Sequence, residues 1–193
     1  MSKKNFDVVV YGATGFTGKL VVEYMLNQYG DDETISWAMA GRSHEKLVAV
    51  RDALGVSKDV PLLTVDSDDE ESITQMVQQT QCVLTTVGPY QLYGPNIVKQ
   101  CVAHGTDYVD LCGEPGWMHE MINEHAAQAK ETGARIVFSC GFDSIPFDLG
   151  VYFLQNKVIA EHGKPASNIR GRVRAMNGEF SGGTAASLSA TMA

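Results

Sequence analysis

Short apolar runs alternate along the chain with longer segments in which apolar residues recur every three or four positions. The runs have the length and β-branched content of strands, and the longer segments have the period of amphipathic helices. This order is typical of a parallel sheet covered by helices on both faces. Six strands are predicted: Phe6–Tyr11, Ile35–Ala40, Leu62–Val65, Val83–Val87, Tyr108–Leu111 and Ile136–Ser139. We therefore expect an α/β protein with a doubly wound, Rossmann-type parallel sheet.

The pattern changes after the sixth predicted strand. A helix is predicted from Pro146 to Glu161, followed by a linker at Gly163–Ser167. From Ile169 to Ala175 an arginine occupies every second position, which is the period of a strand. The small residues Ser181–Thr184 then open a further helix, which has no cap before Ala193. We therefore expect a Rossmann domain at residues 1–162 and, at 163–193, the start of a truncated α+β substrate or dimerisation domain.

The first predicted strand runs directly into three glycines with the spacing Gly-x-x-Gly-x-x-Gly. In a dinucleotide-binding turn the first glycine permits the turn, the second admits the pyrophosphate and the third lets the helix approach the sheet. Free N–H groups at the helix start attract the anion. A glycine turn without a ligand is the weaker interpretation, because a strand and a helix flank the motif. The candidate cofactor-binding residues here are Gly12, Ala13, Thr14, Gly15, Phe16, Thr17 and Gly18.

A Walker-type phosphate loop is excluded by two features of the same segment. Five residues, rather than four, separate Gly12 from the Gly18–Lys19 pair. Leu20 also stands where a serine or threonine would bind magnesium.

The end of the second predicted strand indicates which dinucleotide is bound. NAD sites commonly place a carboxylate there to hold the ribose 2′-hydroxyl, whereas this strand ends in Ala40-Gly41-Arg42-Ser43. Arg42 can pair with a 2′-phosphate, and Ser43 adds a hydroxyl and the start of a helix. NADP(H) is therefore predicted in preference to NAD(H). A surface charge at Arg42 and a plain N-cap at Ser43 are alternatives that remain compatible with binding.

The third and fourth strands deliver further candidates to the same edge of the sheet. Asp66 either approaches the adenine or belongs to a solvated acidic helix start. Four residues at and just beyond the end of the fourth strand are expected to flank the pyrophosphate or the nicotinamide ribose, with a simple turn as the alternative. They are Thr86, Val87, Gly88 and Pro89.

No proton donor can be assigned from the sequence. Tyr90 and Tyr93 lie in a loop beside the predicted nicotinamide site, and packing is their alternative role. Glu114 and Asp143 follow the fifth and sixth strands and could orient a substrate or act as acids, with helix capping as the alternative for Asp143. No tyrosine has a lysine four residues later, which excludes the Tyr-x-x-x-Lys mechanism of short-chain reductases.

Charge and composition exclude several classes of protein. The formal net charge of −8 disfavours nucleic acid and anionic membrane surfaces as partners. No apolar run approaches the roughly 20 residues that a transmembrane helix needs. Four scattered cysteines and five histidines lack ligand spacing, so no metal site is expected. We expect a cytoplasmic protein that forms a homo-oligomer through apolar surface left open by the truncated domain, with the edge of the predicted Arg170–Ala175 strand as one route.

Five motifs in this order resemble the saccharopine dehydrogenase-like oxidoreductases, which include the trans-acting enoyl reductases. They are Tyr11–Gly18, Ala40–Ser43, Val87–Tyr90 with Tyr93–Gly94, Tyr108–Pro115 and Gly141–Pro146. The only departure is Cys112, where relatives more often carry threonine. Members of this family are considerably longer, so the chain resembles their N-terminal portion.

The resemblance implies an NADP(H)-dependent oxidoreductase that transfers hydride to or from an enoyl or imine group. It also implies a small-molecule or lipid-acyl substrate. A non-catalytic sensor or scaffold that binds NADP(H) through the same glycines is the alternative.

Overall fold

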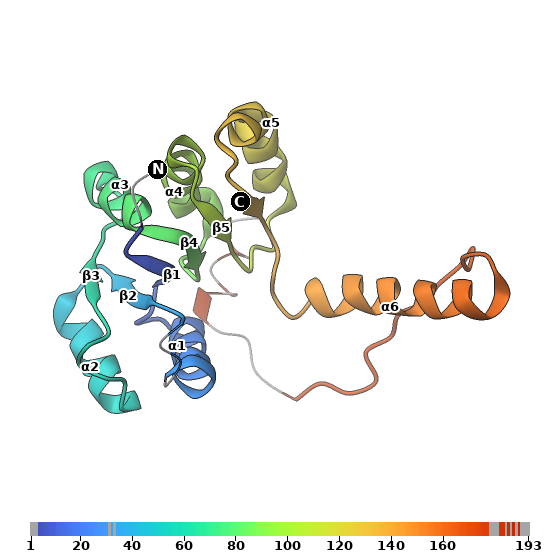
Figure 1. The fold of residues 1–193 in the computed structure, drawn as a ribbon, viewed down its shortest axis with the longest axis horizontal. Helices are drawn as coiled ribbons and strands as arrows, with labels where there is room; N and C mark the ends of the chain where they lie inside the picture. The colour runs from blue at the N-terminus through green and yellow to red at the C-terminus, as the bar shows by residue number, and fades with distance from the viewer. Residues whose placement is uncertain are drawn as a thin grey trace.

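The structure is a computed structural model that describes residues 4–30, 32, 34–177, 182, 183, 185, 187 and 189. Its centre is one parallel sheet with the strand order β3-β2-β1-β4-β5-β6 (Figure 1). The strands are β1 (Phe6–Tyr11), β2 (Trp37–Gly41), β3 (Leu62–Thr64), β4 (Thr80–Thr85), β5 (Asp107–Val109) and β6 (Ile136–Val137). The order reverses direction between β1 and β4, which is where such sheets bind ligands. This topology confirms the predicted Rossmann-type fold.

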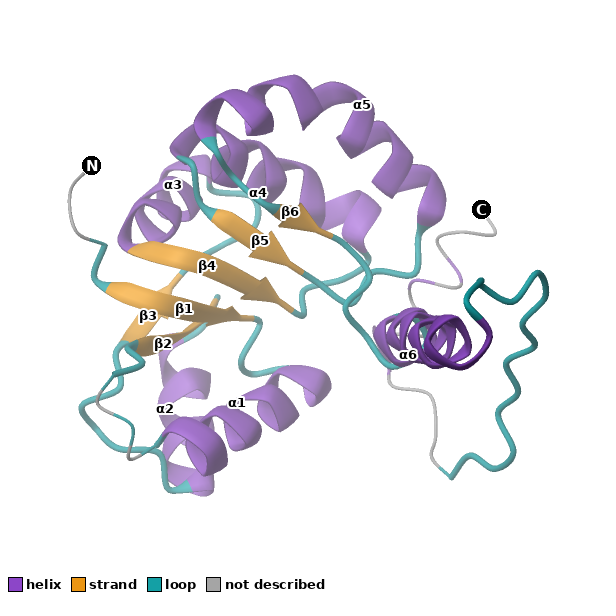
Figure 2. Ribbon diagram, turned by 45° about the vertical axis from the view of Figure 1, so that its right-hand side comes forward, coloured by secondary structure: helices purple, strands orange, loops and turns teal. Residues whose placement is uncertain are grey.

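Five helices cover the two faces of the sheet (Figure 2). Helices α1 (Phe16–Tyr29) and α2 (His44–Leu54) lie on one face. Helices α3 (Glu70–Gln79), α4 (Tyr90–His104) and α5 (Pro115–Thr132) lie on the other. Successive side chains of a strand point to opposite faces, so Val10 packs with the α1–α2 layer and Val9 with the α3–α5 layer. Burial on both faces explains why β1 reads as a continuous apolar run.

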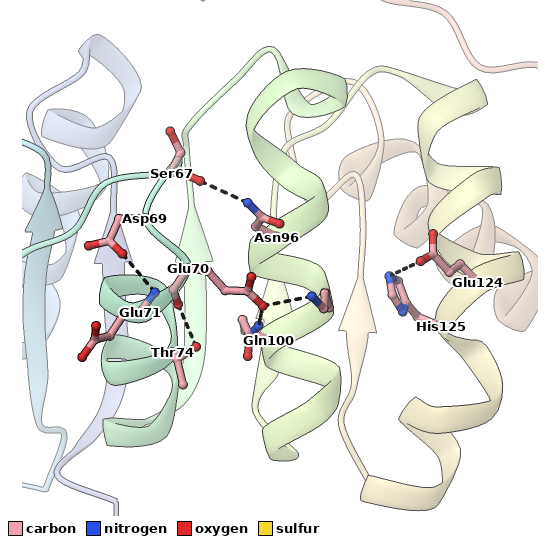
Figure 3. Close-up of polar contacts among 10 residues, drawn as sticks. Ser67, Asp69, Glu70, Glu71, Thr74, Asn96, Gln100, Glu124 and His125 are labelled. Atoms are coloured by element: carbon pink, nitrogen blue, oxygen red, sulfur yellow. Dashed lines mark hydrogen bonds and ion pairs between the residues drawn. The ribbon is translucent and has the colours of Figure 1, made fainter.

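A polar seam joins α3 to α4 (Figure 3). The Glu70 carboxylate accepts hydrogen bonds from Lys99 Nζ (2.9 Å) and Gln100 Nε2 (2.7 Å). At the same seam Asn96 Nδ2 donates to the Ser67 carbonyl (3.5 Å). These contacts hold the loop that follows β3 against α4, at the edge of the sheet where the predicted site lies.

The strand bounds differ from the predicted ones most at β4. Its ladder with β1 begins at the Phe6–Thr80 pair and ends at Thr85, so the strand starts three residues earlier than the apolar run. Thr80 and Gln81 are polar, so the first part of the strand does not belong to the apolar run. The strand therefore ends earlier too, and Thr86 and Val87 belong to the loop that follows.

Helix α6 (Ile145–His162) is found where a helix was predicted, but it projects away from the sheet (Figure 1). None of its side chains is buried, and apolar residues such as Tyr152 and Phe153 are more than 60% exposed. Despite this apolar character, no helix in the described part of the chain is long and apolar enough to cross a membrane.

The predicted strand at Ile169–Ala175 is wrong. In the structure this segment is irregular and almost entirely exposed. An alternating pattern supplies the period of a strand but no partner ladder, and the apolar face of this segment carries only two large side chains, Ile169 and Val173. Of the predicted Ser181–Thr184 motif, Ser181 and Thr184 lie outside the described residues, and the domain division at residue 162 stays a prediction.

Candidate cofactor-binding site

The first glycine of the motif makes the turn from β1 into α1. Gly12 has a φ of +89°, a conformation that side chains disfavour. A Cβ at this position would also lie 2.7 Å from Thr86 Oγ1. The N–H groups of Gly12 and Ala13 both donate to the Ala40 carbonyl, at 3.0 and 3.1 Å. The turn is therefore held between the ends of β2 and β4.

The other two glycines have different tasks. A Cβ on Gly18 would overlap the Gly12 carbonyl oxygen, so only glycine lets α1 lie this close to the turn. Gly15 is the N-cap of α1, is exposed and offers no side-chain cap. Lys19 N donates to the Gly15 carbonyl (3.0 Å), so the N–H groups of residues 16–18 precede the first intrahelical bond. They form the start of a helix that is open to an anion.

At the same edge of the sheet, the N-termini of the neighbouring helices are already capped by side chains. Ser43 Oγ accepts from Lys46 N at the start of α2 (3.3 Å), which makes Ser43 the N-cap. Asp69 caps α3 in the same way by accepting from Glu71 N (3.1 Å). The start of α4 is occupied by the Glu114 carboxylate. Among α1–α4, and within the described residues, only α1 begins without a side-chain acceptor.

Arg42 and Asp66 mark the end of the site beside β2 and β3. Arg42 is exposed directly after Gly41, and no carboxylate stands at the tip of β2. The charges of both residues affect the pKa of the Tyr11 phenol, at the end of β1. Burial and the negative charge of Asp66 raise the pKa of Tyr11 to about 12, while a hydrogen bond with Ser67 and the charge of Arg42 oppose the shift. Asp66 also accepts from Asp68 N (3.1 Å) and so orders its own turn.

The loop after β4 lies against the glycine turn. Thr86 N donates to the Tyr11 carbonyl (2.9 Å), and Val87 N donates to Thr85 Oγ1 (3.1 Å). The Gly88–Pro89 peptide bond is cis. The structure thus brings the predicted cofactor-binding residues to one edge of the sheet, around the point where the strand order reverses.

The two tyrosine candidates for proton transfer lie in the first turn of α4, not in a loop. Tyr90 is 4% exposed and its ring packs on Trp117, with the ring centres 5.8 Å apart. Burial raises the pKa of the Tyr90 phenol, so it holds its proton firmly. Tyr90 is therefore a core residue, as its alternative interpretation proposed, and Tyr93 is half-buried beside it.

The two carboxylate candidates differ in their surroundings. Glu114 is 4% exposed and both of its oxygens accept backbone N–H groups, from Tyr90 (3.0 Å) and Gln91 (2.8 Å). Asp143 is exposed just before α6. Ser144, rather than Asp143, occupies the N-cap position of α6, and it makes no side-chain capping bond.

Asp110 is a buried carboxylate to which no role was given from the sequence. It accepts hydrogen bonds from Tyr108 Oη (2.8 Å), Cys112 N (2.9 Å) and Ser139 N (2.8 Å). Burial raises the pKa of Asp110 despite these three donors. The carboxylate ties the loop after β5 to the loop after β6. The predicted strand Tyr108–Leu111 included Asp110, whereas β5 ends at Val109, and the contact with residue 139 was not visible in the sequence.

Ser187 is a second residue that the sequence did not single out. Its Oγ lies 3.6 Å from the position that a Cβ on Gly88 would take. A residue far along the chain therefore lies beside the loop after β4. Its small side chain gave no functional signal beyond its size.

This geometry defines a dinucleotide-binding domain: a doubly wound parallel sheet with an open helix start at the point where its strand order reverses. The family model of the saccharopine dehydrogenase NADP-binding domain matches residues 8–137. The chain belongs to that family, which confirms the resemblance seen in the sequence and makes nicotinamide dinucleotide binding a property of this domain.

Individual relatives agree with this assignment. The chain is 46% identical to a trans-acting enoyl reductase of Mycobacterium leprae over 82% of its length, which is 38% of that relative. It is 47% identical to a lipid droplet localized protein of Caenorhabditis elegans over 78% of its length, which is 36% of that relative. The chain thus spans less than half the length of the curated relatives it matches.

A solved structure gives the same fold. Apo saccharopine dehydrogenase (L-Glu forming) from Saccharomyces cerevisiae superimposes with a TM-score of 0.63 at 18% identity. The match covers 82% of this chain and 32% of the yeast chain. At this identity the likeness concerns the fold.

Two glycine substitutions should separate stability from cofactor binding. We expect Gly18→Ala to lower the free energy of unfolding by about 1–3 kcal/mol, because its methyl group overlaps the Gly12 carbonyl. Gly15→Ala should change stability by less than about 0.5 kcal/mol, because Gly15 has an extended backbone with its nearest contact at 3.4 Å. Its methyl group should instead weaken NADP⁺ binding by obstructing the open helix start. Denaturant unfolding and calorimetric titration measure the two effects, and equal NADP⁺ affinity in Gly15→Ala would contradict the assigned anion site.

Proposed function

We propose that the chain is the cofactor-binding part of an NADP(H)-dependent oxidoreductase that transfers hydride to or from a C=C or C=N bond. The observation that carries the proposal is the uncapped start of α1 beside Gly12, with Arg42 rather than a carboxylate at the tip of β2. The first feature suits a pyrophosphate and the second a 2′-phosphate. Membership of an NADP-binding family supports both.

The residues of this chain have three tasks in the proposed reaction. The segment from Gly12 to Gly18 holds the pyrophosphate on backbone N–H groups. Arg42, Ser43 and Asp66 surround the adenosine end. The loop from Thr86 to Pro89 lies on the nicotinamide side. When bound, the nicotinamide supplies or accepts the hydride, so the protein contributes orientation and electrostatics.

An enoyl substrate is favoured over an imine. The name of the Mycobacterium leprae relative states enoyl reduction, and that protein shares 46% identity with this chain. We therefore propose a small-molecule or lipid-acyl substrate. We also propose that residues 163–193 begin a second domain that approaches the cofactor, since Ser187 lies near Gly88. The four cysteines are free thiols, which supports a cytoplasmic location.

A non-catalytic NADP(H) sensor or scaffold is the second candidate. The observation in its favour is the burial of Tyr90 and Glu114, which leaves neither free to deliver a proton to a substrate. Tyr93 and Asp143 are the more accessible candidates of the four.

Cofactor preference tests the role of Arg42. We expect NADPH to bind about tenfold to a hundredfold more tightly than NADH, as a charged hydrogen-bonded pair with the 2′-phosphate would give. Arg42→Ala should abolish that difference by weakening NADPH alone. Arg172→Ala, which removes the same charge from an exposed segment away from the sheet, is the matched control. Fluorescence titration measures the six affinities of the three proteins for NADPH and NADH, and equal binding of both cofactors to the unmodified chain would refute the preference.

Hydride transfer separates the two candidate functions. A version of the protein that spans the full length of the relatives is loaded with NADPH and mixed in a stopped-flow instrument with a panel of enoyl thioesters and imines. We expect oxidation of the bound cofactor with at least one enoyl compound. Persistent NADPH across the whole panel, with binding intact, would favour the sensor.

The exposed helix α6 leads us to propose self-association of the 193-residue chain. Its apolar side chains lie on all sides of the helix, and a helix of this kind is normally buried. The Ile169–Ala175 segment is not a strand, so pairing of strand edges there is not the route. Light scattering should give a mass above 20.9 kDa, and Phe153→Glu should lower it. A clean monomer would contradict self-association.

A further inference from the structure

We propose that Glu114 is a positioning residue, which holds the loop after β4 in place for the nicotinamide half of the cofactor. The proposal rests on the proposed function and deepens it. It starts from an unusual contact: a buried carboxylate from the β5–α5 loop occupies the N-terminus of α4. One Glu114 oxygen accepts from Tyr90 N (3.0 Å) and the other from Gln91 N (2.8 Å).

The need for this contact follows from the residue before the helix. Pro89 is the N-cap of α4, and its side chain has no oxygen to accept the first N–H groups. Glu114 supplies both acceptors from 24 residues away, and a carboxylate makes stronger bonds to such N–H groups than a neutral acceptor does. Its charge also occupies the positive end of α4. An anionic cofactor is thereby directed to α1, the open helix start next to it.

The loop that Glu114 holds has little freedom to move. The start of the loop packs closely on Gly12. A Cβ built on that glycine would lie 2.7 Å from Thr86 Oγ1 and 2.8 Å from Val87 Cγ2. At the end of the loop, the first turn of α4 is tied to Glu114. The residues between, Gly88 and Pro89, are fixed from both sides. Loss of the hydrogen bonds to Glu114 would loosen this loop, while the contacts of α1 and Arg42 with the rest of the cofactor would remain.

Glu114 is itself held by a hydrogen-bonded chain. Glu114 N donates to Cys112 Sγ (3.3 Å), and Cys112 N donates to Asp110 Oδ1 (2.9 Å). Ser139 Oγ donates to the Cys112 carbonyl (2.7 Å). The ends of β5 and β6 therefore set the position of the carboxylate. A contact needed only to cap α4 would not require this support from two further strands.

The test compares two ligands that differ in the nicotinamide half. NADP⁺ spans the whole site, whereas adenosine 2′,5′-bisphosphate carries the adenine and 2′-phosphate but no nicotinamide. We expect Glu114→Gln to weaken NADP⁺ binding about tenfold, since glutamine keeps one acceptor and turns an N–H₂ group towards the other N–H. Binding of the bisphosphate should change less than about twofold, because the adenosine end of the site lies apart from the loop that Glu114 holds. Glu120→Gln, an exposed carboxylate on α5, is the control and should change neither.

A second measurement reports position rather than affinity. At saturating concentration, NADPH bound to Glu114→Gln should show fluorescence closer to that of free NADPH than it does on the unmodified protein. If thermal unfolding shows that Glu114→Gln is not folded, Glu114→Asp takes its place. Aspartate retains the charge but is one methylene shorter, and it should show the same selective loss of NADP⁺ affinity.

Three outcomes have distinct meanings. Selective loss of NADP⁺ affinity supports the positioning role. Equal weakening of both ligands, or no weakening of either, overturns it, because Glu114 would then act on the whole domain or on nothing in the site. Failure of the unmodified protein to bind either ligand would refute the proposed function itself.

Discussion

The close approach of α1 to the glycine turn is the constraint on which the site depends. Gly18 lies against the Gly12 carbonyl with no room for a Cβ, and this contact sets the position of the helix start. If α1 were farther from the turn, its first N–H groups would no longer face the point where the strand order reverses. The pyrophosphate site is thus a result of backbone packing, and the glycines contribute mainly because they have no side chains that would obstruct it.

The predictable part of the molecule is the part set by local pattern. Strand–glycine–helix order placed the turn at Gly12 correctly, and the absence of a carboxylate beside Arg42 was visible without a structure. Both features depend on neighbouring residues in the chain. The sheet order followed from repetition of one strand–helix unit, for which few arrangements are favourable.

What the sequence did not reveal depends on contacts between distant residues. Tyr90 and Glu114 were considered for proton transfer because each follows a strand, but they meet each other across 24 residues and lie in the core. The Ile169–Ala175 segment shows the converse problem. Alternation can be read from a sequence, whereas a neighbouring strand to bond with cannot.

The nearness of Ser187 to Gly88 has a thermodynamic consequence. Two residues far apart in the chain lie together beside the place proposed for the reactive end of the cofactor. A ligand that contacts both will bind more tightly when they are docked together than when they are apart. By reciprocity, binding of that ligand must favour the arrangement in which the two residues lie together by the same factor. Ligand occupancy and the contact between these two residues are then two measurements of a single coupling free energy.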